Sequence, residues 1–142
     1  MKSFLSAAAL WLAAFWWGSL TSVGFGVVPL LFAYLPTPAM AGNMAAKLFA
    51  AQTWVAVVCG MFLLLASRSN QPADQVKRVQ SALVFIVSGM LLALLSEFAV
   101  APHIIARDNL ALWHGVGTAL YLLQWLCAGL TLHKLTRRSS GA

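Results

Sequence analysis

Residues Phe4–Leu35 have the sequence FLSAAALWLAAFWWGSLTSVGFGVVPLLFAYL, which contains no Asp, Glu, Lys or Arg. About 20 apolar residues in a helix cross the roughly 30 Å hydrocarbon core of a bilayer, so this stretch is long enough to span it. The apolar region of a signal peptide is shorter, roughly 7–15 residues. Although Ala39-Met40-Ala41 resembles a cleavage site, we expect the stretch to remain as a transmembrane helix. Pro29 is expected to kink that helix or to mark where its end unwinds.

Three further apolar runs follow the first. Pro36 and Pro38 indicate a turn before the second run. Pro102 is expected to close the third run, and Asp108 is a candidate N-cap for the fourth. The sequence therefore predicts an all-α integral membrane protein, a single domain over residues 1–142. Its four transmembrane helices are expected at about 5–34, 45–66, 79–101 and 110–132.

The composition excludes an ordinary soluble domain. Hydrophobic residues make up 61% of the chain and charged residues 8%, whereas a typical soluble domain is about 25% charged. The net charge of +6 arises from short basic clusters beside the apolar runs. Membrane topology and anionic lipid headgroups explain such clusters better than nucleic-acid binding does. We therefore expect the lipid bilayer as the partner, and no nucleic acid.

Lysine and arginine residues are unevenly divided between the two sides of the predicted bundle. One side receives only Lys47 and Arg107. The other side receives the remaining seven, which are Lys2, Arg68, Lys77, Arg78, Lys134, Arg137 and Arg138. Because positive residues favour the cytoplasm, both termini are expected there. The expected location is a bacterial inner (plasma) membrane.

Small residues recur every four positions along the first helix, at Gly18, Ser22 and Gly26. Such stripes allow two helix backbones to approach closely inside lipid. They predict helix packing within the monomer or, as an alternative, a homo-oligomer. Shorter stripes of the same kind are Gly89 and Ala93, and Gly115 and Ala119.

Three ionisable residues fall near the same predicted membrane surface: Lys47, Glu97 and His114. Ionisable groups inside a membrane are costly unless they are paired, so they are candidates for a functional site. Along the fourth helix His114, Thr118, Tyr121, Gln124 and Ala128 are spaced to form one polar and small face. The expected ligand-binding residues are Lys47, Gln52, Glu97, His114, Tyr121 and Gln124, with Arg107 and Asp108 as further members of the cluster. The alternative is a structural ion pair between Lys47 and Glu97.

A cofactor is not expected, but haem or copper is an alternative. A metal site would use His103 and His114, with Met40 and Met44 as soft ligands for copper. His133 lies at the opposite membrane face and cannot join them. The sequence contains no Ser/His/Asp arrangement for nucleophilic catalysis, so no catalytic residues are expected.

The segment FAYLPTPAMAGNMAAKLF, from Phe32 to Phe49, resembles the signature of the transmembrane protein 205-like family, whose bacterial members carry domain of unknown function 4149. The matching positions are Leu35, Pro36, Gly42, Lys47, Leu48 and Phe49. The segment WHGVGTALYLLQWLCAGLTL, from Trp113 to Leu132, is similar to the last helix of that family at His114 and Gly115. Glu97 and Pro102 correspond less closely. The resemblance implies a four-helix membrane protein and no defined activity.

These observations lead to one preferred function and two alternatives. The preferred one is a non-enzymatic inner-membrane protein whose polar cluster, at the periplasmic end of the bundle, binds a small ligand, ion or lipid headgroup, or supports a partner protein. The first alternative is a haem- or metal-binding redox protein, because four-helix bundles hold such cofactors. The second alternative is a small oligomeric transporter or channel.

Overall fold

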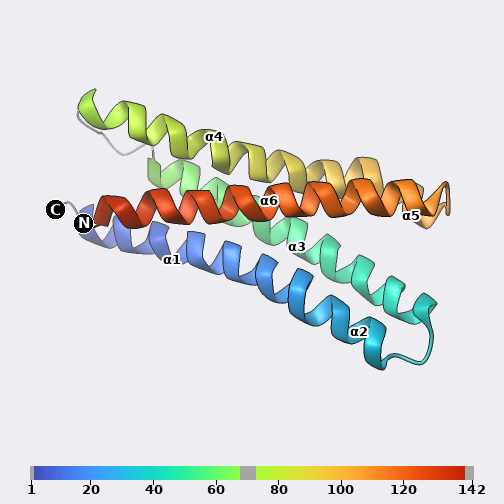
Figure 1. Cartoon of the computed structure of the whole chain (residues 1–142). Coiled ribbons are helices and arrows are strands. Elements are labelled where there is room, and N and C mark those ends of the chain that lie inside the picture. The colour runs from blue at the N-terminus through green and yellow to red at the C-terminus, as the bar shows by residue number, and fades with distance from the viewer. Residues whose placement is uncertain (1, 68–72, 140–142) are drawn as a thin grey trace.

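The computed structural model describes the backbone of residues 2–67 and 73–139, which form four long helical rods (Figure 1). The first rod consists of α1 (Lys2–Thr21), the π-helical segment η1 (Ser22–Val27) and α2 (Val28–Tyr34). The second rod is α3 (Pro38–Ser67). The third consists of α4 (Ala73–Leu95), the π-helical segment η2 (Ser96–Val100) and α5 (Ala101–Ile105), and the fourth is α6 (Leu110–Ser139).

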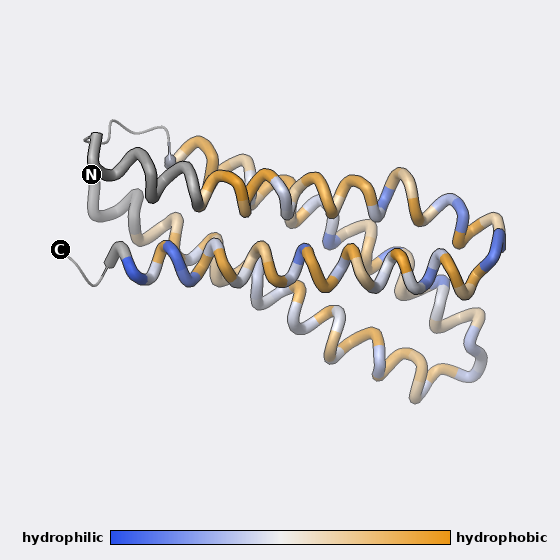
Figure 2. Tube along the Cα trace, turned by 45° about the horizontal axis from the view of Figure 1, so that its top comes forward, coloured by the Kyte–Doolittle hydropathy of each residue, from blue (hydrophilic) through white to orange (hydrophobic). Residues whose placement is uncertain are grey.

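Each rod contains a segment that is long and apolar enough to cross a bilayer. These segments cover residues 7–34, 38–67, 82–105 and 110–137. Figure 2 shows apolar residues along all four rods, with hydrophilic residues gathered near the turns at one end and near the C-terminal end of α6. Many large apolar side chains are exposed on the outside of the bundle, among them Phe62, Val84, Leu91 and Leu126. The chain is thus an all-helical, multi-pass membrane protein by its helix composition.

The rods run back and forth, so the start of α1 and the end of α6 lie at the same end of the bundle (Figure 1). The turn between α2 and α3 and the turn between α5 and α6 lie at the opposite end. We call this second end the turn end. The α1–α2 rod and α3 diverge from α6 toward the turn end (Figure 1).

Two of the rods widen into a π-helical turn just before a proline. η1 ends at Val27, two residues before Pro29, and η2 ends at Val100, two residues before Pro102. Proline has no N–H to donate and clashes with the carbonyl one turn earlier, and a wider turn is one way for a helix to continue past it. The expectation that Pro102 closes the third helix is therefore wrong, because α5 continues to Ile105.

Two helix starts differ from the expected ones. α3 begins at Pro38 instead of near residue 45, because Thr37 Oγ1 accepts a 3.2 Å hydrogen bond from Met40 N and proline suits the first helical position. Asn109, not Asp108, caps α6: its Oδ1 accepts a hydrogen bond from Leu112 N at 3.4 Å. Asp108 instead lies 3.5 Å from His103 Nδ1.

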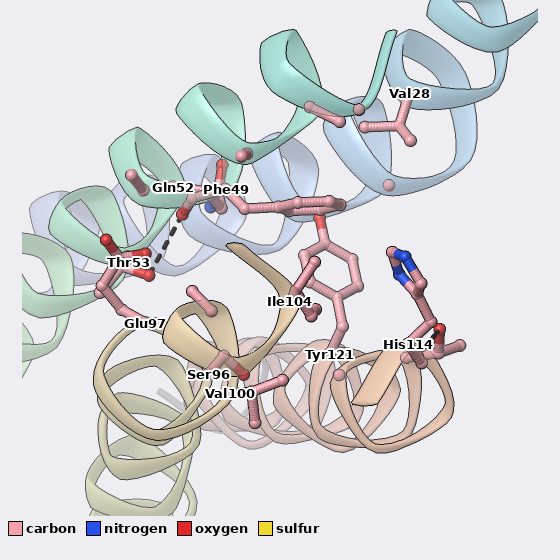
Figure 3. Close-up of a pocket in the computed structure, with 18 of the residues that line it drawn as sticks. Val28, Phe49, Gln52, Thr53, Ser96, Glu97, Val100, Ile104, His114 and Tyr121 are labelled. Carbon is pink, nitrogen blue, oxygen red and sulfur yellow. Dashed lines mark hydrogen bonds between the residues drawn. The ribbon is translucent and has the colours of Figure 1, made fainter. Parts of the chain in front are cut away.

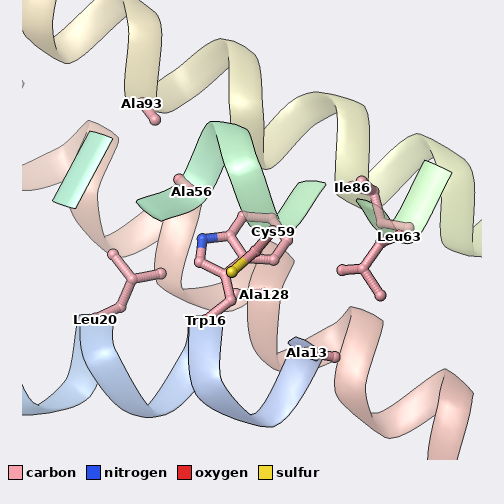
Figure 4. Packing of buried hydrophobic residues seen from close by; sticks show 9 residues of the cluster. All are labelled: Ala13, Trp16, Leu20, Ala56, Cys59, Leu63, Ile86, Ala93 and Ala128. Atoms are coloured by element: carbon pink, nitrogen blue, oxygen red, sulfur yellow. The ribbon is translucent and has the colours of Figure 1, made fainter. Parts of the chain in front are cut away.

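The packed core lies in the half of the bundle away from the turn end. Its centre is Trp16, which is fully buried among residues of all four rods (Figure 4). Glycines make room for large side chains here, since a Cβ atom at Gly89 would come within 2.6 Å of the Trp16 ring, and one at Gly129 within 2.9 Å of Trp17 Nε1. Gly60 likewise accommodates Met90. Inside lipid, such close packing is a main source of helix association.

The small-residue stripe on the first rod does not take part in this packing. Among the described residues, nothing lies within 4 Å of the position that a Cβ atom would have at Gly18 or Gly26. Ser22 between them is exposed. Gly115 also faces open space, whereas Gly89 and Ala93 are buried against neighbouring helices. Of the three stripes, only the one on α4 therefore packs inside the described part of the chain.

Candidate functional site

A cavity of about 580 Å³ lies between the diverging helices toward the turn end. Volumes of this size are typical of small-molecule sites. All four rods contribute to its wall: η1 and α2, the first half of α3, η2 and α5, and the first half of α6. Most of the wall is apolar, with Phe25, Val28, Phe32, Phe49 and Ile104 among its side chains. Figure 3 shows several of the lining side chains from these elements.

The six residues expected from the sequence to bind a ligand all line this one cavity. Lys47 and Gln52 come from α3, Glu97 comes from η2, and α6 supplies His114, Tyr121 and Gln124. Arg107 and Asp108, which were expected nearby, are not among the lining residues and lie exposed in the turn before α6. The structure thus brings the core of the predicted cluster together and leaves its two outer members in the turn.

One part of the polar face of α6 lines the cavity, and the rest lies in the packed core. His114, Thr118, Tyr121 and Gln124 line the cavity, whereas Ala128, one turn further along, is fully buried in the packed core around Trp16. The 3.6-residue helical repeat keeps these positions on one face, and the divergence of the rods decides which of them meet a cavity.

Tyr121 is fixed at the cavity wall by contacts to two other helices. Its hydroxyl donates a 2.7 Å hydrogen bond to the backbone oxygen of Leu20, at the end of α1. Its ring meets the Phe49 ring edge to face, with the ring centres 5.3 Å apart. The Tyr121 ring also occupies the space that a side chain at Gly24 would need. Gly24 therefore allows α6 and η1 to approach closely beside the cavity.

Gln52 and Thr53 form a polar layer at the inner part of the cavity. The Gln52 amide nitrogen donates to Ser19 Oγ at 2.9 Å, and both Gln52 and Thr53 are buried. Thr53 Oγ1 lies 3.1 Å from the Phe49 backbone oxygen, the bond drawn in Figure 3, and 3.4 Å from the Ala93 backbone oxygen. Because buried polar groups are costly without partners, these bonds stabilise a polar wall within the membrane span.

The ionisable groups of the cavity are not paired with one another. Within residues 7–67 and 82–137, whose side chains are described, neither Lys47 nor Glu97 takes part in an ion pair or a hydrogen bond. The alternative of a structural ion pair between them does not match this geometry. Lys47 and His114 are exposed and Glu97 is half-buried, so the cavity wall carries a base and an acid that remain available.

Two buried polar atoms at the cavity also lack a partner among the described residues. They are Ser96 Oγ and the Gln124 amide nitrogen. Gln124 is only 3% exposed, and native proteins rarely leave such groups unsatisfied. Ser96 and Thr53 were not among the residues expected from the sequence. Their positions directly beside Glu97 and Gln52 are the only signal that could have found them.

The histidines considered as metal ligands have different surroundings. The His103 ring stacks on Trp113, with centres 4.0 Å apart and planes 2° apart, and its Nδ1 faces Asp108. His103 is not a lining residue of the cavity, whereas His114 is. In the part of the chain that the structure describes, no three His, Cys, Asp or Glu side chains form a group able to hold a metal ion.

The cavity therefore combines an apolar wall with a small number of polar and ionisable groups from three helices. A wall of this kind suits a ligand that is itself amphipathic, since the apolar part gives affinity and the polar groups fix the orientation. The described residues show no arrangement of a nucleophile with a hydrogen-bonded base.

Comparison with known proteins identifies the family of the chain. No curated protein and no solved structure matches the chain. Residues 11–112 match the model of a domain of unknown function, DUF4149. The match covers more than half of the chain and includes Lys47, Gln52 and Glu97, and it ends just before His114. The chain therefore belongs to the DUF4149 family.

Proposed function

We propose that this protein binds a small amphipathic molecule in the cavity at the turn end of its bundle, without transforming it chemically. The observation that supports this most directly is the convergence of the six residues expected from the sequence, which come from α3, η2 and α6, on one cavity of about 580 Å³. Membrane spans rarely contain such groups, and those that occur usually mark a ligand or ion pathway.

The shape of the bundle supports the same proposal. Close packing around Trp16 occupies the half away from the turn end, so the cavity is confined to the half where the helices diverge (Figure 1). Two π-helical turns, η1 and η2, contribute Gly24, Phe25, Ser96 and Glu97 to its wall. Irregular turns of this kind are frequent at functional sites.

We further propose that the cavity faces the periplasmic side of a bacterial inner membrane, with the start of α1 and the end of α6 in the cytoplasm. The support is the distribution of basic residues along the sequence, since only Lys47 and Arg107 lie in or near the two turns of the turn end, and the other seven lie in other parts of the sequence. Positive residues are enriched on the cytoplasmic side of membrane proteins.

A matched pair of phenylalanine substitutions on α6 tests the binding proposal. Thr118 lines the cavity, whereas its neighbour Ala119 is exposed and is not a lining residue. Thr118→Phe is expected to fill part of the cavity and to remove a co-purifying ligand, while Ala119→Phe adds the same ring on another face of α6. Native mass spectrometry of the detergent-purified variants measures the ligand-bound fraction.

The expected result is a bound species in the wild type and in Ala119→Phe, with an affinity that falls by about tenfold or more in Thr118→Phe, a loss of about 1.4 kcal/mol of binding free energy. Equal bound fractions in the two variants would show that the cavity is not the binding site. Absence of any bound molecule from the wild type, also after incubation with total membrane lipid extract, would reject the proposal.

A further inference from the structure

The wall of the cavity presents an acid and a base that do not neutralise each other. Glu97 projects from η2 and Lys47 from α3, and both line the cavity. Within the described side chains, neither is joined to an ion-pair or hydrogen-bond partner. Glu97 is half-buried, about 12 Å before the end of α5 when measured along the helix at 1.5 Å per residue. A carboxylate at that depth is expensive unless something enters the cavity to pair with it.

A ligand with a single charge would satisfy only one of these two groups. An anion that binds Lys47 leaves the Glu97 carboxylate unpaired and adds a like charge to the same cavity. A cation that binds Glu97 leaves the Lys47 ammonium unpaired, and the two positive charges repel each other. A head that carries both charges satisfies both side chains at once, with charge-assisted hydrogen bonds at each end.

We propose that the ligand is a zwitterionic amphiphile, with an ammonium group held by Glu97 and a phosphate or carboxylate held by Lys47. This inference rests on the proposed binding function and specifies its ligand. His114 lies closer to the end of the bundle, about 6 Å after the start of α6, and lines the same cavity as a second donor for the anionic group. The apolar part of the ligand lies against the cavity wall formed by Val28, Phe32 and Ile104.

The two buried polar atoms without partners support the same assignment. Ser96 Oγ neighbours Glu97 in the chain, and the Gln124 amide nitrogen lies on the facing helix α6. Both are hydrogen-bond donors. The oxygens of a phosphate or carboxylate are acceptors, so the anionic group that follows the ammonium in the head complements these donors. The cavity thus offers partners for an ammonium and for an anion.

The test titrates the purified full chain, in detergent and stripped of lipid, with defined probes and measures binding by native mass spectrometry. The probes have matched chains and differ in the head: a phosphatidylethanolamine is zwitterionic, a phosphatidylglycerol is anionic, and a diacyl trimethylammonium lipid is cationic. We expect the zwitterionic probe to bind at least about tenfold more tightly than either of the others. Glu97→Gln is expected to lower the affinity for phosphatidylethanolamine to that for phosphatidylglycerol, and Lys47→Gln to weaken both phospholipids.

Arg107→Gln serves as the matched control. It removes one positive charge from the same end of the bundle at an exposed residue outside the cavity, so it should leave the preference for the zwitterionic head unchanged. Competition by water-soluble phosphoethanolamine would show that the zwitterionic head is recognised by itself, whereas failure to compete would show that binding also requires the apolar part of the lipid. Both outcomes support the zwitterionic head.

Equal affinity of the wild type for the three lipids overturns the inference. The proposed binding function survives that result if Thr118→Phe still removes the bound probe, so the two failures are distinguishable. Circular dichroism and gel filtration show whether Glu97→Gln folds. If it does not, the comparison of the three probes on the wild type still tests the preference for a zwitterionic head.

Discussion

Gly24 and Gly26 stand two residues apart in the same π-helical turn and have opposite surroundings. A Cβ atom at Gly24 would overlap the Tyr121 ring, whereas one at Gly26 would meet nothing within 4 Å among the described residues. Tyr121 has little freedom to move away, because its hydroxyl is bonded to the Leu20 oxygen and its ring packs on Phe49. An added methyl group would therefore clash at position 24 and meet no neighbour at position 26.

Gly24→Ala is expected to lower the free energy of unfolding by about 1–3 kcal/mol, as overpacking does in a filled site. Gly26→Ala should leave it unchanged or raise it by up to about 1 kcal/mol, since alanine is the better helix former. Unfolding by a denaturing detergent, followed by circular dichroism, measures both. Equal effects of the two substitutions would contradict the close contact between Gly24 and Tyr121.

At the scale of single residues, the sequence could place Lys47, Glu97 and His114 toward one end of the bundle, because that position follows from the distance of each residue to the end of its helix. It could not decide which way the small residues face. The i, i+4 spacing of Gly18, Ser22 and Gly26 defines a face of the helix, but in a helix that is apolar all round nothing in the pattern says whether a neighbour covers that face. Here none does within the described chain.

At the scale of elements, the start of α6 depends on one asparagine. Asn109 Oδ1 accepts the hydrogen bond from Leu112 N, and the Asn109 backbone oxygen accepts the one from Trp113 N at 3.1 Å. Its φ angle is 32°, a value that asparagine and glycine tolerate better than other residues do. Asp108 was the expected cap, and the two residues cannot be ranked by type because both are strong N-caps.

Asn109→Ala is expected to destabilise the protein by about 1 kcal/mol through loss of the cap. Asn109→Gly should cost only a few tenths of a kcal/mol, because glycine suits the positive φ angle. Asp108→Ala removes only a contact to His103 between two side chains that are 45% and 66% exposed, so its effect should be close to zero. Thermal unfolding in detergent compares the three variants, and a larger loss for Asp108→Ala than for Asn109→Ala would assign the cap to Asp108.

The two π-helical turns show what sequence patterns miss at this scale. Pro29 and Pro102 indicate a disturbance of the helix, and the disturbance does occur close to both. A proline pattern does not say whether the helix ends or continues with a wider turn, because that choice depends on packing against neighbouring helices. In the third rod the wider turn carries Ser96 and Glu97 into the cavity wall.

At the scale of the whole molecule, the bundle is packed at one end and open at the other. Trp16 and the glycines that surround it hold the rods together in the half that contains the start of α1 and the end of α6. The cavity separates the rods in the other half. The four apolar runs could be predicted from the pattern of apolar residues along the sequence, but the divergence of the rods could not, since it depends on side-chain volumes along contacting faces.

Single cysteines at the two ends test the proposed topology. In a Cys59→Ala/Cys127→Ala background, Ala106→Cys lies at an exposed position in the turn before α6, and Ser139→Cys lies at the last residue of α6, beyond the apolar segment 110–137. In intact spheroplasts a membrane-impermeant maleimide should label the cysteine at position 106 and leave the one at 139 unlabelled until the membrane is permeabilised. The reverse labelling pattern would show that the protein has the opposite orientation in the membrane.

The divergence of the rods also affects the surrounding bilayer. A bundle that is wider at the turn end than at the opposite end displaces more lipid from one leaflet than from the other (Figure 1). In profile the bundle is therefore wedge-shaped (Figure 1). We expect a change in lateral pressure in the leaflet around the turn end to alter the separation of the α1–α2 rod and α3 from α6, so that membrane curvature and lipid shape act on the same helices that form the wall of the cavity.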